Sequence, residues 1–185
     1  MSHGAFTMQL ARRLQPEYNS QGYDILHDHG EAGIDSPLKL GKIRSWFGES
    51  CNTGTILSDL DMAVISNENE RVYALVVIEE TTHKPRAILG DIIAVLLGNG
   101  VKFKGIRDLK VGKWTSLIVM VHDASQSQLD RILFFARQGN YVRENLLTPN
   151  ASMGKIIIDS FVDPMQLEEK LRQNINAAIA NRGTW

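Results

Sequence analysis

Two pairs of acidic residues lie at the ends of neighbouring apolar runs, where they are suited to metal-dependent chemistry. Asp59 and Asp61 come at the start of one run, TILSDLDMAVIS, and Glu79 and Glu80 come at the end of the next, RVYALVVIEE. The NENE segment between the runs predicts a hairpin turn, so the two strands should be antiparallel. The start of the first strand then lies beside the end of the second, and we expect the carboxylates to meet at one edge of a sheet.

Side-chain alternation decides which carboxylates can converge. Asp59 and Asp61 share one face of their strand, whereas Glu79 and Glu80 point to opposite faces of theirs. Two converging carboxylates suit a hard divalent cation such as Mg²⁺ or Mn²⁺, which prefers oxygen ligands and keeps several waters. Such an ion polarises a phosphodiester and lowers the pKa of a bound water. The alternative interpretation is that these acids are solvated charges at strand ends.

An aspartate that opens one strand of a hairpin, followed by an apolar strand ending in glutamate, a basic residue and a helix, resembles the PD-(D/E)xK nuclease superfamily. The resemblance covers roughly residues 53–123. Asp61 in DLDMAVI matches the first acid of the motif, and Glu79 in LVVIEET matches the second. The resemblance implies a restriction-endonuclease-like core, Mg²⁺ or Mn²⁺ held by these two acids, and cleavage of DNA. An acid from a preceding helix often joins such a site, and Glu31 is the best candidate here, followed by Glu49.

The chain departs from the motif at its basic position. The lysine expected two residues beyond Glu79 is Thr81, and no proline precedes Asp61. Lys84 comes just before the next helix, and a migrated lysine occurs within the superfamily. The resemblance therefore assigns Lys84 to orienting the attacking water or stabilising the phosphate. An alternative alignment makes Glu80 the metal ligand. The missing lysine and the near-neutral charge favour a second interpretation, a non-catalytic nucleic-acid- or protein-binding module with the same fold.

A basic segment downstream, VKFKGIRDLKVGKW, is the best candidate for contact with DNA phosphates. Basic and apolar residues alternate in it, which is typical of an exposed strand or loop with one cationic edge. The other interpretation is an edge segment whose lysines prevent aggregation. The basic residues of this segment are Lys102, Lys104, Arg107, Lys110 and Lys113.

The composition indicates an ordinary globular protein. A chain of 185 residues with 43% hydrophobic and 22% charged residues can form one domain with a buried core. The formal net charge of −1 means that any contact with DNA must be local. The single Cys51 excludes an internal disulfide. No apolar run reaches the roughly 18 residues of a membrane span, so we expect a cytoplasmic protein. A homodimer is possible by analogy with nucleases that cut both strands.

The pattern of elements predicts an α/β fold, with a mixed central sheet flanked by helices on both faces. We expect one nuclease-like domain over residues 1–185, with its core at about 53–123, N-terminal helices in 5–50, and a C-terminal strand and helix in 154–181. Pro16 should end the first helix, at 6–15, and Ser36 and Pro37 should open a second at 36–50. Residues 22–36 fit either a strand or a helix. The remaining expectations are strands at 55–66, 71–80, 114–123 and 154–161, with helices at 84–100, 125–140 and 163–183.

Overall fold

The computed structural model describes residues 5–28, 41–80, 85–98, 100–104, 107–142, 144–145 and 153–180. Within these ranges the elements are, in chain order, α1 (Ala5–Ser20), β1 (Tyr23–His27), β2 (Ile43–Trp46), β3 (Ile56–Leu60), β4 (Met62–Ser66), β5 (Val72–Glu79), α2 (Pro85–Leu97), β6 (Gly100–Phe103), β7 (Arg107–Leu109), β8 (Ser116–His122), α3 (Gln126–Val142), β9 (Lys155–Phe161) and α4 (Pro164–Ala180).

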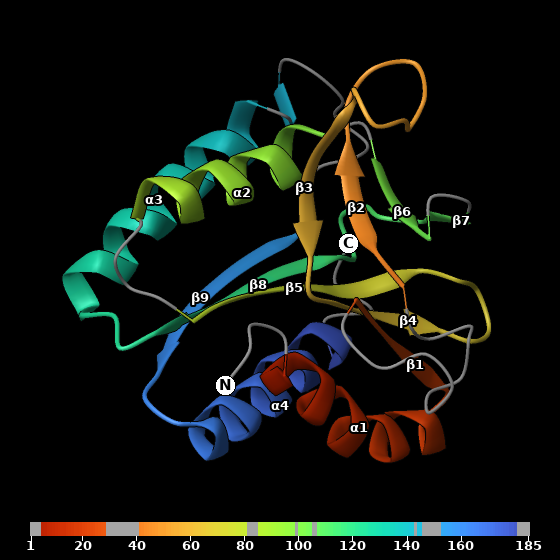
Figure 1. The fold of residues 1–185 in the computed structure, drawn as a ribbon, viewed down its shortest axis with the longest axis vertical. Coiled ribbons are helices and arrows are strands. Elements are labelled where there is room, and N and C mark those ends of the chain that lie inside the picture. The colour runs from red at the N-terminus through yellow and green to blue at the C-terminus, as the bar shows by residue number, and fades with distance from the viewer. Residues whose placement is uncertain are drawn as a thin grey trace.

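A mixed five-stranded sheet forms the centre of the molecule, with strand order β1-β4-β5-β8-β9. The pairs β1–β4 and β4–β5 are antiparallel, and the pairs β5–β8 and β8–β9 are parallel. Helices α1 and α4 cover one face of this sheet, and α2 and α3 cover the other (Figure 1). The predicted α/β class, with a mixed sheet between helices, is therefore confirmed.

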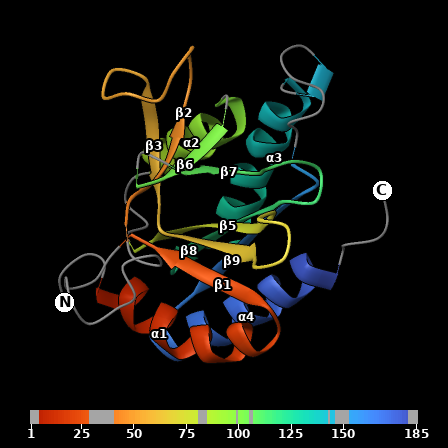
Figure 2. The same cartoon turned by 90° about the vertical axis from the view of Figure 1, so that its right-hand side faces the viewer.

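A second sheet stands beside α2 and rises from one end of the central sheet (Figures 1 and 2). Its strand order is β3-β2-β6-β7, and all of its pairs are antiparallel. Strand β3 passes into β4 through Asp61 alone, so the single strand predicted at 55–66 is two strands in different sheets. The burial pattern changes at this point. In β3 buried Ser58 and Leu60 alternate with more exposed residues, whereas every residue of β4 is buried.

Two helix predictions in the N-terminal part are wrong. The described portion of 36–50 contains β2, in which Ile43 and Ser45 are buried and their neighbours are partly exposed. That alternation is a strand pattern, and it outweighs the helix-start signal at Ser36 and Pro37. Of the helices expected in 5–50, the described residues contain α1 alone, and α1 continues through Pro16 to Ser20.

Helices α1 and α3 both extend beyond their predicted C-terminal ends, and packing explains both differences. Tyr18 lies beyond Pro16 and is fully buried, so packing of the last turn of α1 outweighs the cost of an internal proline. The helix expected at 125–140 runs on as α3 to Val142, past Gly139. A Cβ at Gly139 would lie 2.6 Å from Ile93 Cδ1 of α2, so this glycine allows close helix–helix contact.

The core has two apolar layers, one on each face of the central sheet. Leu75 and Val77 of β5 pack with α2 and α3, whereas Val76 and Ile78 pack with α1 and α4. Burial on both faces explains why β5 and β8 are continuous apolar runs. Among the described residues no helix is both long and apolar enough to cross a membrane.

Candidate functional site

Asp61 is held by backbone hydrogen bonds at the sheet edge where β1 and β5 end and β4 begins. The Asp28 N–H donates to the Asp61 carbonyl at 3.2 Å, and the Asp61 N–H donates to the Val76 carbonyl at 3.0 Å. The Asp61 Oδ2 accepts a 2.7 Å hydrogen bond from the Ile78 N–H. The fold therefore fixes the Asp61 carboxylate beside β5, at the residue that precedes Glu79.

The divergence of the two sheets explains why a side chain takes this position. Strand β4 pairs Met62 with Val76, and beyond Met62 the chain turns away into the second sheet as β3. The backbone N–H of Ile78 then lacks a strand carbonyl at that place, and the Asp61 carboxylate supplies the acceptor. A charge-assisted bond of this kind is stronger than a neutral one.

Asp91 of α2 adds a carboxylate near Glu79. Its Oδ1 accepts a 3.1 Å hydrogen bond from the Ser58 Oγ. Burial raises the pKa of Asp91, the Ser58 hydrogen bond lowers it in part, and the negative charges of Glu79 and Asp59 raise it further. The net direction is upward, so this carboxyl group holds its proton more tightly than an ordinary aspartate does.

Lys42, the residue before β2, and Arg44 within β2 bring positive charge to this edge. The Lys42 Nζ lies 3.1 Å from Asp28 Oδ2 and 3.3 Å from Asp59 Oδ2, and the Arg44 Nε lies 3.0 Å from Asp59 Oδ1. Burial lowers the pKa of Lys42, but the hydrogen bonds and charges of Asp28 and Asp59 outweigh that effect and raise it above its ordinary value. Lys42 is therefore a positive charge at neutral pH and does not act as a base.

The predicted metal ligands are divided by the sheet. Asp61 and Glu79 lie at the same edge, as expected from the hairpin. Glu80 lies on the opposite face from Glu79 and lines a cavity of about 360 Å³ with His122 and Asp163, at the start of α4. The predicted residues Glu31 and Lys84 fall outside the described residues.

The donor chemistry at the edge fits a hard cation, although the described side chains do not complete a ligand set. In the described ranges, no group of three or more His, Cys, Asp or Glu side chains is arranged to hold a metal ion. Mg²⁺ is commonly bound through one or two carboxylates and completes its shell with waters. Asp61 and Glu79 provide oxygen donors of that kind.

The predicted basic segment forms β6, β7 and the residues that follow them, and most of its charges are paired with acids. The pairs are Lys102 with Asp108 at 3.6 Å, Arg107 with Glu70 at 2.9 Å, Lys110 with Glu70 at 3.9 Å, and Lys113 with Glu144 at 3.8 Å. The Lys104 Nζ lies 5.3 Å from the centre of the Phe103 ring. Pairing with acids reduces the positive charge that this segment can offer to phosphates.

Strand pairing places one end of the basic segment beside the candidate site. Lys102 of β6 pairs with Arg44 of β2, and the Lys104 N–H donates to the Lys42 carbonyl at 2.8 Å. Arg44 and Lys102 therefore lie on two adjacent strands near the acidic edge, and Lys42 and Lys104 flank these strands.

Sequence reasoning missed Asp28, Lys42 and Asp91 as members of this site. Asp91 carries a visible signal, because it is the charged residue inside the apolar run AILGDIIAVLL. Asp28 and Lys42 carry none, since they are brought together by the pairing of β2 with distant strands.

Comparison of the chain with family models, with curated proteins and with solved structures gives no match. The fold and the site thus define a class in structural terms only: an α/β protein with a carboxylate-rich edge where two sheets meet.

Proposed function

We propose that the protein is a metal-dependent phosphodiesterase that acts on DNA, with its site at the edge around Asp61 and Glu79. One observation carries the proposal: the Ile78 N–H holds the Asp61 carboxylate at 2.7 Å, at the position just before Glu79. Two carboxylates from adjacent antiparallel strands are thereby supplied at one sheet edge.

We further infer a restriction-endonuclease-like core. Strands β4 and β5, helix α2 and strand β8 follow the strand, strand, helix, strand order that the resemblance implies, with β6 and β7 inserted between α2 and β8. Strands β5 and β8 are parallel, as a helical crossover requires. In this interpretation the second sheet, β3-β2-β6-β7, is an addition that forms a wall beside the site.

In this proposal Asp61 and Glu79 hold Mg²⁺ or Mn²⁺, with Glu80 and Glu31 as further acids. The bound ion supplies polarisation of the phosphodiester and a water of lowered pKa. Asp91 lies close enough to Glu79 for their charges to interact, and it adds negative charge that favours a cation there.

Lys42 is the described cation best placed to stabilise charge on the phosphate. It takes the role that the resemblance assigned to Lys84, because its ammonium contacts Asp28 and Asp59 at the same edge. Separate Lys42→Gln and Lys84→Gln variants distinguish the two lysines. We expect the larger loss of cleavage for Lys42→Gln, and a larger loss for Lys84→Gln would return the role to Lys84.

Cleavage of plasmid and linear DNA with Mg²⁺ or Mn²⁺ tests the proposal. Asp61→Asn keeps an oxygen acceptor for the Ile78 N–H but removes the charge, and Glu79→Gln does the same beside it. We expect each variant to lose at least about a hundredfold in rate, as when a group that stabilises a transition state is removed. Glu169→Gln on the exposed face of α4 is the matched control. Cleavage that survives both site substitutions would rule out this site.

Thermal denaturation tests metal binding without any substrate. At a metal concentration tenfold above the dissociation constant, binding should stabilise the folded protein by about 1.4 kcal/mol. We expect this stabilisation in the parent protein and in Glu169→Gln, and its loss in Asp61→Asn. Equal stabilisation of all three proteins would place the metal elsewhere.

A non-catalytic nucleic-acid- or protein-binding module with the same fold is the second candidate, and the pairing of Lys42 with acids favours it over an enzyme. Asp28 and Asp59 already contact the ammonium of Lys42, which limits its freedom to approach a phosphate. DNA binding without cleavage in either metal would select this candidate.

A further inference from the structure

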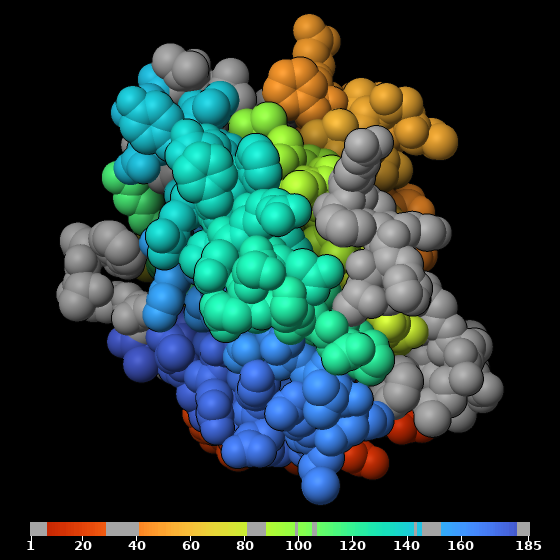
Figure 3. Space-filling view, turned by 90° about the vertical axis from the view of Figure 1, so that its left-hand side faces the viewer, coloured from red at the N-terminus to blue at the C-terminus, as the bar shows by residue number. Residues whose placement is uncertain are grey.

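An aromatic stripe lies on the outer face of α3. Phe134 and Tyr141 are 58% and 61% exposed, and Phe135 is 45% exposed. The Phe134 and Phe135 rings meet edge to face, with centroids 5.4 Å apart. Figure 3 looks onto this side of the molecule, where α3 lies in front. Large apolar side chains gathered on a surface mark contact sites.

The helix pattern explains why these rings face outward. The buried positions of α3, which include Leu129, Ile132 and Ala136, face the rest of the molecule. The opposite side carries exposed residues spaced four, three and four apart, which is the spacing of a helix–helix seam. These outward residues are Asp130, Phe134, Arg137 and Tyr141.

Opposite charges flank the central ring of this stripe. Asp130 lies one turn before Phe134, and Arg137 lies about one turn after it. Asp130 accepts a 2.8 Å hydrogen bond from the Gln126 Nε2. In the part of the chain that the structure describes, Arg137 forms no ion pair. An antiparallel copy of the same stripe would place its base opposite this acid and its acid opposite this base.

We propose that a second copy of this chain docks on α3, so that the two α3 helices pack antiparallel across a two-fold axis beside Phe134. The axis brings the two Phe134 rings into contact and pairs Asp130 of each chain with Arg137 of the other. A two-fold interface uses the same patch on both subunits, so it requires a self-complementary surface. The Asp130–Phe134–Arg137 stripe is self-complementary in charge, and its central ring is apolar on both copies.

The size of the surface sets the expected strength. A helix of 17 residues is about 25 Å long, so one helix pair buries less than the roughly 800 Å² per partner of a standard interface. The dimer should therefore be weak and concentration-dependent, with dissociation in the micromolar range.

Sedimentation velocity over a concentration series from low to high micromolar tests the dimer. We expect a monomer–dimer equilibrium for the parent chain and at least about tenfold weaker association for Phe134→Glu, which places a charge at the centre of the apolar contact. Phe47→Glu is the matched control, because Phe47 is 54% exposed on another part of the molecule. A parent chain that stays monomeric overturns the proposal, and so does a dimer that Phe134→Glu leaves intact.

A charge exchange tests the pairing itself. Asp130→Arg and Arg137→Asp should each weaken the dimer, because like charges then face each other across the axis. The double variant should restore association to about the parent strength, since the opposite charges are exchanged but still paired. A double variant that is no stronger than either single variant rules out the antiparallel arrangement. Unchanged melting temperatures would show that all variants fold.

Discussion

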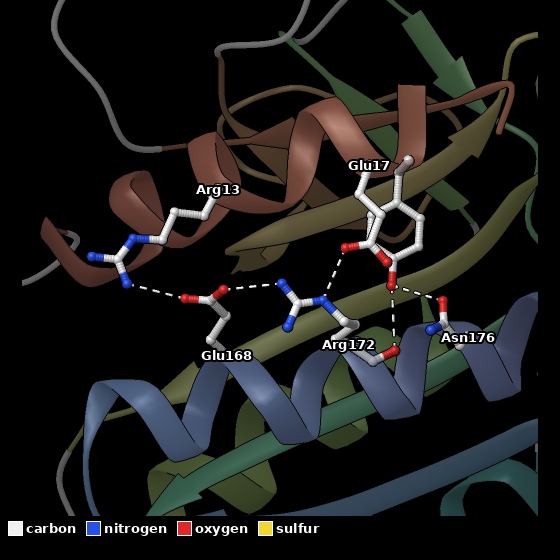
Figure 4. Close-up of polar contacts among 6 residues, drawn as sticks. Arg13, Glu17, Glu168, Arg172 and Asn176 are labelled. Carbon is white, nitrogen blue, oxygen red and sulfur yellow. Dashed lines mark hydrogen bonds and ion pairs between the residues drawn. The ribbon is translucent and has the colours of Figure 1, made fainter. Parts of the chain in front are cut away.

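The interface between α1 and α4 and the sheet edge around Asp61 both gather charged side chains, but they balance charge differently. Between the helices, Arg13, Glu168, Arg172 and Glu17 form a chain of three ion pairs with distances of 2.9 to 3.0 Å (Figure 4). Cations and anions alternate along this chain and are equal in number. The charges of these four residues balance, and their ion pairs join α1 to α4.

Among the described residues, the sheet edge has more acids than bases. Lys42 and Arg44 pair there with Asp28 and Asp59, and Asp61, Glu79 and Asp91 add further carboxylates. Burial raises the pKa of Asp91, and the negative charges of Glu79 and Asp59 raise it further. Such negative charge favours the arrival of a cation. A balanced cluster stabilises the fold, whereas an unbalanced one is suited to binding a cation.

Burial separates the two regions as well. The Lys42–Asp28 and Arg13–Glu168 ion pairs are 3.1 and 3.0 Å long. The Asp28 side chain is 3% exposed and that of Glu168 is 19% exposed, while the cations Lys42 and Arg13 are 45% and 61% exposed. Each member of the first pair is less exposed than its counterpart in the second, so water screens the first pair less.

The largest expected effect on stability comes from removing the Lys42 ammonium beside the buried carboxylate of Asp28. Lys42→Met leaves Asp28 without its cation among other acids, and we expect the free energy of unfolding to fall by about 2 kcal/mol. Urea denaturation measures this change. Lys113→Met is the matched control, because the Lys113–Glu144 pair is half exposed on both sides, and it should change stability by less than about 0.5 kcal/mol. Equal losses in the two variants would remove the distinction drawn from burial.

On the helix side, the buried hydroxyl should matter more than the exposed charges. The Tyr18 hydroxyl donates to Asn176 Oδ1 at 2.9 Å and lies 3.3 Å from the Arg172 carbonyl, and the side chain is fully buried. Tyr18→Phe should lower the free energy of unfolding by about 1 kcal/mol, because the hydrogen bonds of the Tyr18 hydroxyl to Asn176 and Arg172 are lost. Urea denaturation of Tyr141→Phe, an exposed tyrosine, provides the control. No difference between the two would show that water replaces the lost bond.

Asp91→Asn should give a smaller change of opposite sign that depends on pH. The folded protein raises the pKa of Asp91 above its ordinary value of 3.8, chiefly through burial. The folded state is then favoured by protonation, and this contribution is lost as the pH rises through the raised pKa. Asparagine keeps an acceptor for Ser58 without the charge. Melting temperatures in metal-free buffer should therefore be higher for Asp91→Asn at about pH 7, with the advantage shrinking towards about pH 4. An advantage independent of pH would contradict this origin.

The smallest change in stability is expected at Arg13, the exposed end of the chain of ion pairs between α1 and α4. Arg13→Ala removes the ion pair with Glu168, which Arg172 still contacts at 3.0 Å. We expect a change in unfolding free energy below about 0.5 kcal/mol, and a weaker one at high salt. Urea denaturation at low and high salt measures both. A loss of unfolding free energy as large as that of Lys42→Met would show that the ion pairs of the two regions contribute equally to stability.

Local patterns were sufficient for the helices and the central-sheet strands that follow residue 62. The NENE turn, the apolar runs of β5 and β8, and the Asp163 cap of α4 each act within a few residues, and the structure has all of them. The Asp163 Oδ1 accepts the N–H groups of Met165 and Gln166, as a helix cap should.

The second sheet and half of the candidate site were beyond local patterns. Strand β2 pairs with β3 and with β6, which comes more than fifty residues later, so nothing near Lys42 in the sequence marks its neighbours. The convergence of Asp61 and Glu79 on one edge could be predicted because a single hairpin sets it. Asp91 is visible as a charge inside an apolar run, but its place at this edge depends on its contact with Ser58 of β3. Asp28 could not be added, because the pairing of β1 with β4 brings it to Asp61.

The passage of the chain from β3 to β4 without a loop has a mechanical consequence. Asp61 is the single residue between the two sheets, and its N–H, its carbonyl and its carboxylate are all bonded to the central sheet. The second sheet thus joins the central sheet, along this strand, at a residue of the candidate site. A shift of β3 relative to the central sheet would therefore act directly on the backbone of Asp61, because this residue alone separates β3 from β4.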